Sequence, residues 1–504
     1  MSSIKKGIVN SWVMLVSTVV TIILIFLQRS YFVNSLGETA LGLNSLFNSI
    51  LSAISIADVG LDTVLLFVLI KPLDAKDHFK LYSLVSFIRK LYFSVAGIIL
   101  IVGICVIPFL SNIINGTHVT PYIILIFLLY LINAVLTYCF AEYRVLLNAN
   151  QQSYVVSIIT FLVTSSMTIA QIISLNVFNS FLAFEIIQIL ATVLMGSLMY
   201  LYVSRHIILT KNNDPISTDD KKTILKNGVG GLSNRIGTFV VFGSDSVLLS
   251  IFTNLVTVAR YSNYMMLVSA VVSIILKALS AMMPSIGHLV IRQNNDEKSN
   301  FFEIFNHGIY LASFVVFGFF LFNADYFIAV WLGQQLMFSK LTTLLIAVNM
   351  LIRIARLGSL NYIDALGLQW KQRWKPVIEA VLNLTVSIIM LYIFKLGING
   401  ILLATLLSNI TTVVWMEPKV VFQNGVTLRK QFLYIVIRFV TLTTGTIIYF
   451  LMFYQAPHNA TILGLLINFL NYALYIVVLV SIEFFTSVHG RLFIKRYIIE
   501  RNNK

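Results

Sequence analysis

Residues 121–141 read PYIILIFLLYLINAVLTYCFA, a run of 21 residues without one charged side chain. A helix rises about 1.5 Å per residue, so about 20 apolar residues cross the roughly 30 Å hydrocarbon core of a bilayer. Similar stretches occupy nearly all of the 504 residues. The chain is 58% hydrophobic and only 11% charged, whereas a soluble domain carries about 25% charged residues. The sequence therefore predicts a protein whose solvent is lipid.

Stretches of this length also decide the kind of secondary structure. Unpaired backbone groups are costly in lipid, so only helices and closed barrels span membranes, and barrel strands are much shorter than these runs. We predict an all-α integral membrane protein with about 14 transmembrane helices. They are expected at residues 9–33, 43–70, 84–110, 121–141, 154–175, 180–204, 228–252, 257–283, 303–330, 341–366, 376–395, 398–417, 432–455 and 460–485.

The distribution of Lys and Arg predicts the orientation of these helices. With the amino terminus inside, 26 Lys and Arg residues fall in cytoplasmic segments and two, Lys340 and Lys395, fall in outer loops. One miscounted helix would destroy this bias, so it indicates an even number of helices and two cytoplasmic termini. The bias, with attraction to anionic lipids of the inner leaflet, accounts for the net charge of +15. No nucleic-acid partner is needed to explain it.

The longest polar connector, residues 205–227, follows the sixth predicted helix. It would join an N-terminal six-helix half, residues 1–204, to a C-terminal six-helix half, residues 228–417. Because six is even, two such halves would be parallel repeats that can rock about a central cavity. The alternative is that the connector is a plain tether. Residues 418–485 would hold helices thirteen and fourteen, and residues 486–504 a basic cytoplasmic tail, either lying along the membrane or solvated.

Several classes of chemistry are disfavoured. Cys105 and Cys139 both fall in predicted helices, and no two of the seven His residues have the spacing of a metal site, so we expect no metal. A nucleotide-binding G-x-x-x-x-G-K-[ST] loop is absent, and we expect neither ATP use nor a cofactor. No predicted loop exceeds about 25 residues. An enzyme with catalytic residues, such as a membrane glycosyltransferase, is therefore the weaker class.

Four arginines within predicted helices are candidates for binding substrate. An ionised side chain at the bilayer centre costs about 2.5–3.5 kcal/mol on insertion scales, so it usually faces a wet cavity or a partner. Arg353 and Arg356 share one face near mid-membrane and suit a pyrophosphate; the alternative is pairing with Asp364 or a neighbouring helix. Arg235 could line a polar cavity or form an internal ion pair. Arg29, near the outer end of the first helix, could contact sugar-phosphate or reach the interface.

Acidic residues within the predicted helices are candidates for ion coupling. Asp58 and Asp62 lie at i, i+4 on one helix face, and two carboxylates so close disfavour the ionisation of both. One of them can then hold a proton, as a proton or sodium coupling site requires. The rival interpretation is that each neutralises an arginine, and Asp245 has the same two interpretations. Structural roles are expected for the acids near helix ends, which are Glu142, Glu185, Glu379 and Glu483.

Five short segments carry a family resemblance. Residues 36–43 read LGETALGL, residues 57–61 ADVGL and residues 71–73 KPL; in the second half, residues 245–252 read DSVLLSIF and lead to YSNY at 261–264. Together they resemble bacterial polysaccharide repeat-unit flippases, for O-antigen, capsule or exopolysaccharide, of the multidrug/oligosaccharidyl-lipid/polysaccharide exporter superfamily. The helix count, short loops and halfway connector match over nearly the whole chain. Asp62 departs from that pattern, in which an apolar or small residue is usual.

The resemblance implies a function and a location. Relatives move undecaprenyl-pyrophosphate-linked oligosaccharides from the inner to the outer leaflet of the bacterial cytoplasmic membrane by alternating access. The implied partners are this substrate, membrane lipid, H+ or Na+ as coupling ion and a polysaccharide polymerase. In the lipid II branch an arginine on the first helix faces the cavity and helices thirteen and fourteen form a groove for the lipid tail. The alternative is a cation-coupled multidrug exporter of the same superfamily, whose cavity is acidic and aromatic.

Overall fold

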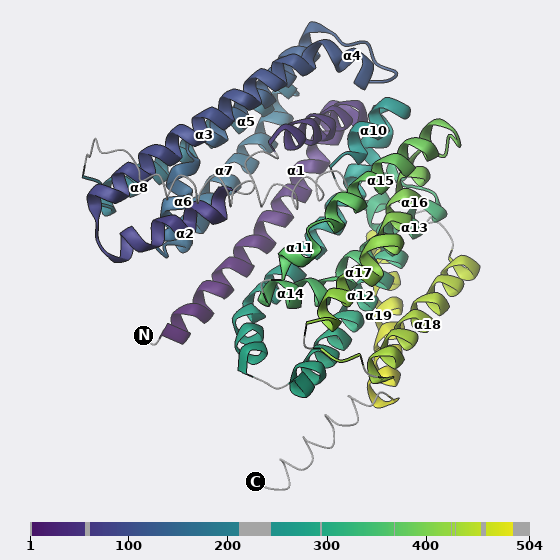
Figure 1. Ribbon diagram of the computed structural model, residues 1–504. Helices are drawn as coiled ribbons and strands as arrows, with labels where there is room; N and C mark the ends of the chain where they lie inside the picture. Colours follow the sequence, from purple (N-terminus) through teal and green to yellow (C-terminus); the bar gives the residue numbers. More distant parts are fainter. Residues whose placement is uncertain are drawn as a thin grey trace. The chain divides into compact units, whose positions relative to one another are not determined.

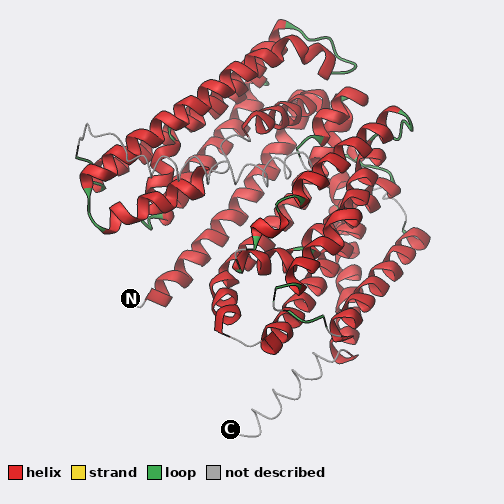
Figure 2. Ribbon diagram, in the orientation of Figure 1, coloured by secondary structure: helices red, strands yellow, loops and turns green. Residues whose placement is uncertain are grey.

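The computed structural model describes residues 3–55, 61–210, 243–292, 295–366, 368–424, 426–428, 430–454 and 460–486. Every regular element in these residues is a helix, as Figure 2 shows. Eleven of the described helices are long and apolar enough to cross a membrane, and the shorter apolar helix Ile462–Val477 adds to them. The protein is thus an all-α, multi-pass membrane protein of about 12–14 helices, which confirms the predicted fold class.

The chain forms two compact units. The first comprises Met1–Ser262 with Leu391–Ile393, and the second comprises Asn263–Met390 with Phe394–Lys504. The boundary at residues 262 and 263 lies within one long helix, α11 (Leu255–Arg292). The predicted six-helix halves, 1–204 and 228–417, and their connector, 205–227, remain predictions, since residues 211–242 are outside the description.

The first unit is built from long helices and a few short ones. In Figure 1, α3, α5 and α8 run side by side, and α1 packs on α7. The helices are α1 (Ser3–Ile54), α2 (Leu61–Asp74), α3 (His78–Val106), α4 (Leu110–Ile113), α5 (Pro121–Cys139), α6 (Ala141–Ala149), α7 (Ser153–Phe178), α8 (Phe181–His206), α10 (Asp245–Phe252) and the start of α11.

The break expected between the first two predicted helices lies at Gly37, inside α1. Within α1 two helical segments meet at Gly37, whose φ of +82° and ψ of 174° lie outside the helical region and are readily adopted by glycine. The predicted span 43–70 is therefore divided between the end of α1 and α2. Other helix ends follow local signals: the Thr120 hydroxyl accepts a hydrogen bond from the Ile123 amide at 3.4 Å, and Pro121 begins α5.

Small residues allow α1 to approach the start of α11 closely. A Cβ atom on Gly42 would lie 2.1 Å from the Leu255 carbonyl oxygen, so only glycine fits there. Elsewhere on α1, the ring of Phe32 packs edge-on against the rings of Phe181 and Phe184 at 5.3 and 5.0 Å. This packing fixes the position of the α1 segment that carries Gln28 and Arg29.

The second unit is arranged around the long helix α12, which packs against α13, α18 and α19. Its helices, after the rest of α11, are α12 (Asn295–Leu332), α13 (Lys340–Ala355), α14 (Leu357–Ala365), α15 (Lys375–Tyr392), α16 (Ile398–Ser408), α17 (Val414–Phe422), α18 (Lys430–Phe453) and α19 (Ile462–Thr486). The predicted span 341–366 corresponds to α13 and α14, which meet at Arg356. A π-helical segment, Asn409–Val413, joins α16 to α17.

A buried carboxylate, Asp325, ties the helices of the second unit together. Its Oδ1 accepts hydrogen bonds from the Tyr264 hydroxyl at 2.5 Å and the Thr343 hydroxyl at 2.6 Å, and its Oδ2 accepts one from the Tyr454 hydroxyl at 2.8 Å. The donors come from α11, α13 and the residue that follows α18. Asp325 is 1% exposed, so hydrogen bonds take the place of its hydration.

Replacing Asp325 by Ala should lower the unfolding temperature of the purified protein in detergent. The change leaves the hydroxyls of Tyr264 and Thr343 without their acceptor, and each unsatisfied buried polar group costs about 1–3 kcal/mol. The matched control is Asp74→Ala, because Asp74 is exposed at the end of α2. Equal unfolding temperatures for the two variants would show that the Asp325 hydrogen bonds contribute no stability.

Candidate functional site

In the first unit, polar side chains inside the helices gather around Arg29. The Gln28 amide donates to Oε1 of Gln171 on α7, and the adjacent Arg29 guanidinium donates to the Ser262 hydroxyl on α11. Arg29 is half-buried. Two consecutive side chains thus tie α1 to two other helices. Because an ionisable side chain inside an apolar helix bundle is costly, Arg29 and its polar neighbours are functional candidates by default.

The polar contacts continue from α7 into α8 and α5. Gln171 is fully buried, and its amide donates to the Phe184 carbonyl at 3.0 Å and to Gln188 Oε1 at 3.3 Å. On α8, the Thr192 hydroxyl donates to Asn133 Oδ1 on α5 at 2.6 Å. Four helices therefore contribute to one line of polar contacts that begins at Gln28.

A buried carboxylate, Glu185 on α8, lies in the same region. It is 1% exposed, and its Oε2 has no hydrogen-bond partner among the described residues. The Tyr130 hydroxyl on α5 is within electrostatic range of both the Glu185 carboxylate and the Arg29 guanidinium. We call Gln28, Arg29, Tyr130, Gln171, Glu185, Gln188 and Ser262 the Arg29 cluster.

Sequence reasoning identifies several members of this cluster as polar groups inside helices, but not their contacts with one another. The position of Glu185 near a helix end predicts a structural role, but the structure places it inside the packed helices. The usable signal is the spacing of Glu185 and Gln188, which puts two polar groups on one face of an apolar helix. Nothing in the sequence shows that this face meets Gln171 and Gln28, since that depends on how α7 and α8 pack.

The predicted coupling residue Asp245 begins α10 and lies next to the Arg29 cluster. It is buried, and its Oδ2 accepts a hydrogen bond from the Tyr261 hydroxyl at 2.5 Å. Tyr261 precedes Ser262, the partner of Arg29, so Asp245 and Arg29 bind adjacent residues of α11. Of the other predicted residues, Asp58 and Arg235 lie outside the described residues, as does the side chain of Asp62 at the start of α2.

A second set of contacts joins α10 to the segment around α4. The Ser250 hydroxyl donates to the Ile113 carbonyl at 2.7 Å, and the backbone amide of Asn115 donates to the Ser250 carbonyl at 3.2 Å. In the predicted topology these residues, like Arg29 and Ser262, lie toward the outer side of the membrane. Within the first unit, residues preceding the 205–227 connector are therefore bonded to residues that follow it.

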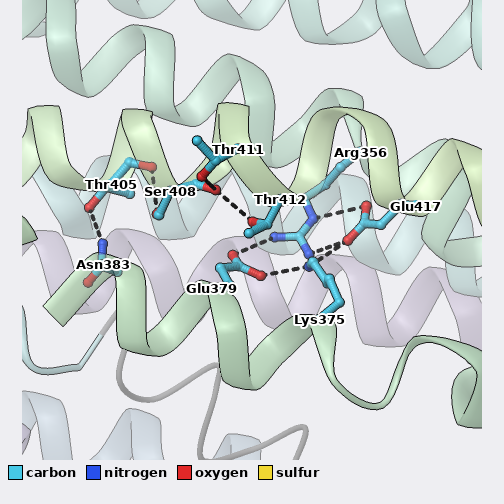
Figure 3. A network of polar contacts seen from close by, with 9 residues as sticks. All are labelled: Arg356, Lys375, Glu379, Asn383, Thr405, Ser408, Thr411, Thr412 and Glu417. Carbon is cyan, nitrogen blue, oxygen red and sulfur yellow. Dashed lines mark hydrogen bonds and ion pairs between the residues drawn. The ribbon is translucent and has the colours of Figure 1, made fainter. Parts of the chain in front are cut away.

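Figure 3 shows a network of four charged side chains in the second unit, here called the four-charge network: Arg356, Lys375, Glu379 and Glu417. The Arg356 guanidinium donates to Glu417 Oε1 at 2.5 Å and Oε2 at 3.3 Å, and to Glu379 Oε1 at 3.5 Å. The Lys375 ammonium lies 2.7 Å from Glu379 Oε2 and 2.7 Å from Glu417 Oε1. Each cation is thus shared between both carboxylates.

The four-charge network is buried and electrically balanced. Arg356 is the most accessible member, with 14% of its side chain exposed, while those of Lys375 and Glu417 are 4% and 1% exposed. Two positive and two negative charges sum to zero, which removes the need for a counter-ion at this place. Arg356 is therefore paired with neighbouring helices, which is one of the two interpretations of the sequence. Its role in substrate binding remains a prediction.

The other arginine of the predicted pair is separate from this network. Arg353 lies one turn earlier on α13, is half-buried and has contacts of its own. The helical geometry continues through Arg356, which joins α13 to α14 and whose amide donates to the Ile352 carbonyl at 3.0 Å, so the i, i+3 spacing of the two arginines is kept. Asp364, the partner considered for them, is exposed near the end of α14.

Irregular helix geometry surrounds the four-charge network. The π-helical segment Asn409–Val413 precedes Glu417, and the Ser408 carbonyl accepts hydrogen bonds from both Thr411 at 3.1 Å and Thr412 at 2.6 Å (Figure 3). The Asn383 amide on α15 donates to the Thr405 hydroxyl on α16 at 3.0 Å. Single π-helical turns inside α-helices are frequent at functional sites. Here the π-helical segment ends four residues before Glu417.

Partial signals for the four-charge network are present in the sequence. Lys375 and Glu379 have the i, i+4 spacing of a helical ion pair. From sequence alone, Lys375 is used only as one of the basic residues that indicate helix orientation, and Glu379 is interpreted only as an acid near a helix end. Glu417 lies beside Pro418, and its partners Lys375 and Arg356 are 42 and 61 residues away in the chain. Such long separations leave no local pattern.

The four-charge network predicts a non-additive effect of mutation. Lys375→Met alone should lower the unfolding temperature markedly, because breaking a buried pair typically costs about 3–5 kcal/mol. Adding Glu417→Leu restores the charge balance, so the double variant should be more stable than the sum of the two single effects. Thermal unfolding of the four proteins in detergent measures this. Lys90→Met, at an exposed position of α3, is the control, and strict additivity would contradict the account.

Comparisons with known proteins relate the fold to other membrane proteins. The family described as "Polysaccharide biosynthesis protein" matches residues 8–290. The structure is similar to the lipid II flippase MurJ in an inward closed conformation, with a TM-score of 0.62 and 15% identity over 93% of this chain and 98% of that one. It is also similar to an inward-facing multidrug resistance MATE transporter of the MOP superfamily, with a TM-score of 0.60 and 13% identity over 84% and 95%.

A third similar structure is the Vibrio cholerae MATE transporter VcmN in its bent form, with a TM-score of 0.56 and 15% identity over 84% of this chain and 96% of that one. Identities this low show a common fold and leave the substrate open. The search of curated proteins found no match.

Proposed function

The chain belongs to the polysaccharide biosynthesis protein family, and on this premise we propose that it is a flippase for undecaprenyl-pyrophosphate-linked oligosaccharide repeat units. It would move them from the inner to the outer leaflet of the bacterial cytoplasmic membrane by alternating access, for surface polysaccharide synthesis. The family match over residues 8–290 is the observation that carries this proposal. The fold shared with a lipid II flippase supports it, because lipid II is also a lipid-linked saccharide.

The Arg29 cluster is the part of the proposed substrate site that the described contacts support best. Arg29 donates to the neutral Ser262 hydroxyl, and a phosphate oxygen is a stronger acceptor for a guanidinium than a hydroxyl is. The amides of Gln28 and Gln188 belong to the same cluster and suit the hydroxyls of a sugar. Arg353 and Arg235 remain proposed contacts. Arg356 would first have to leave Glu379 and Glu417.

In the proposed cycle, the contacts near the predicted outer side would have to break when the protein opens outward. One hydrogen bond joins Arg29 to Ser262, and two others join Ile113 and Asn115 to Ser250. Release of substrate to the outer leaflet would have to separate the segments that these bonds connect. A substrate phosphate that takes over Arg29 would weaken the first of these contacts. Binding and opening would then be coupled through one guanidinium.

The energy source we propose is H+ or Na+ antiport, or the membrane potential acting on the anionic substrate. Of the proposed coupling residues, Asp245 is the one whose side chain the structure describes. It is buried and accepts a hydrogen bond from Tyr261, which is adjacent in the chain to Ser262, a partner of Arg29. Asp58 and Asp62 remain proposed coupling residues. Cytoplasmic termini and a polysaccharide polymerase as partner belong to the same proposal, which includes no catalytic step by this chain.

A cation-coupled multidrug exporter is the second candidate. The similarity to MATE transporters favours it, and so do the buried carboxylates Glu185 and Asp325, since acidic cavities attract organic cations. Asp325 is, however, already engaged by three hydroxyl donors. The family match points to polysaccharide synthesis instead, and the two candidates differ in the charge of the molecule that they move.

The proposal predicts that Arg29→Ala slows flipping of an undecaprenyl-pyrophosphate oligosaccharide in proteoliposomes. The loss of one charge-assisted hydrogen bond, about 1.5–3 kcal/mol, corresponds to a rate lowered by about tenfold or more. Leaflet accessibility of the glycan to an added lectin or glycosidase gives the initial rate.

Ser262→Ala is the comparison variant, because it removes one contact of Arg29 and keeps the guanidinium. We expect this variant to flip at the wild-type rate or faster. A wild-type rate for Arg29→Ala at equal reconstitution would remove Arg29 from the substrate site, and slow flipping by both variants would assign the effect to the Arg29–Ser262 contact.

A further inference from the structure

Residues 369–375 read QWKQRWK and connect α14 to α15, and the proposed function gives them no role. Their two indole rings are among the most exposed large apolar groups described: Trp370 is 70% exposed and Trp374 is 65% exposed. Neither ring is part of the packed core. A tryptophan that protein does not cover in a membrane protein is typical of the boundary between hydrocarbon and headgroups.

The helix that follows carries an exposed apolar face. Helix α15 exposes a stripe of aliphatic side chains at helical spacing after Trp374, namely Val377, Ile378, Val381, Ile388 and Ile389. We take this stripe to face lipid tails, since it lies on a helix long and apolar enough to cross a membrane. Glu379 is buried, where it belongs to the four-charge network. Trp374 stands at the beginning of the lipid-facing stripe, and the charged residues Lys371 and Arg373 come shortly before it.

Three exposed cations accompany these rings and contact neutral groups among the described residues. Arg373 lies over the Trp370 ring, 4.4 Å from its centroid, and donates to the Trp370 carbonyl at 3.3 Å. Lys371 donates to Asn424 Oδ1 beyond the end of α17. On α17, Lys419 lies 5.8 Å from the centroid of the exposed Trp415 ring. Helix α17 also contacts residues 369–372, so these groups form one surface.

Two buried acids on the helices of this surface are already engaged. Glu379 and Glu417 are bound by Arg356 and Lys375 in the four-charge network. Within the described part of the chain, none of Lys371, Arg373 and Lys419 forms an ion pair. Three exposed positive charges therefore lie beside exposed indole rings, at the end of the exposed stripe of α15.

We propose that this surface, the indole–cation patch, binds the phosphate of an anionic glycerophospholipid of the surrounding bilayer: Trp370, Lys371, Arg373, Trp374, Trp415 and Lys419. The stacked Arg373 guanidinium is held in place and suits bidentate binding of a phosphodiester, with Lys371 and Lys419 adding positive charge. The predicted topology puts both segments of the patch on the cytoplasmic side, where anionic headgroups attract basic residues. The patch does not depend on the proposed flippase activity.

Lipid bound at the patch would act on the four-charge network. Lys375 follows Trp374 directly and begins α15, and it bonds to Glu417 of α17 at 2.7 Å. A headgroup that bridges the 369–375 connection and α17 would hold together the two segments that this ion pair joins. Anionic lipid is therefore expected to stabilise the folded protein, since a ligand that binds only the folded state raises its stability.

The test is the unfolding temperature of the purified full-length protein in a neutral detergent, with added phosphatidylglycerol or phosphatidylcholine. Phosphatidylglycerol should raise the unfolding temperature of the wild type more than phosphatidylcholine does, and added salt should reduce the difference. In the double variant Lys371→Gln with Arg373→Gln the difference should fall to about half or less. The control is Lys76→Gln with Arg205→Gln, which removes two exposed cations of the first unit and should retain the full difference.

Two outcomes would overturn the proposal. One is an equal effect of the two lipids on the wild type, and the other is an undiminished phosphatidylglycerol effect in the patch variant. A third arm adds undecaprenyl pyrophosphate: stabilisation by this lipid and not by phosphatidylglycerol would assign the patch to the substrate carrier and contradict a bilayer-lipid site. If the double variant is unstable, Arg373→Lys replaces it. This change keeps the positive charge but removes the planar guanidinium that can bind a phosphate bidentately, so it should weaken the phosphatidylglycerol effect.

Discussion

The cost of an unpaired charge in hydrocarbon is the constraint on which the rest of this structure depends. A chain that is 58% hydrophobic is expected to place a charge inside the membrane beside a partner, and the four-charge network and Asp325 of the second unit follow this rule. Arg356 and Lys375 share Glu379 and Glu417, and Asp325 accepts three hydroxyl hydrogen bonds. These groups connect helices that apolar packing alone would leave free to slide, since lipid tails solvate an apolar helix as well as another helix does.

The same constraint separates structural polar groups from functional candidates. The four-charge network is balanced and nearly closed to solvent, so it is best understood as a joint between the start of α14, α15 and α17. The Arg29 cluster is different, because it combines a half-buried guanidinium with neutral amides, a hydroxyl and a carboxylate that has an unsatisfied oxygen among the described residues. An incompletely satisfied group of this kind can exchange its protein partners for those of an anionic, hydroxyl-rich substrate.

Sequence alone predicts the fold class, because a hydrophobic stretch long enough to span a bilayer follows directly from the thickness of the hydrocarbon core. It also identifies Arg29, Asp245 and Arg356 as charges inside helices. It does not predict that two helical segments of α1 meet directly at Gly37, nor the partners of Arg356, which are 23 and 61 residues away in the chain. Glu185 is interpreted from sequence as a helix-end acid, because the sequence does not show which helix ends other helices cover. Periodicity reveals faces, whereas the pairing of faces is a tertiary property.

The central claim is that this member of the polysaccharide biosynthesis protein family moves a lipid-linked oligosaccharide across the membrane. The most direct measurement compares wild-type proteoliposomes with protein-free liposomes that carry an undecaprenyl-pyrophosphate oligosaccharide in one leaflet. Appearance of the glycan on the opposite leaflet only when the protein is present is the expected result. An unchanged distribution of the glycan, together with protein-dependent transport of an organic cation, would contradict the claim and identify the chain as a drug exporter.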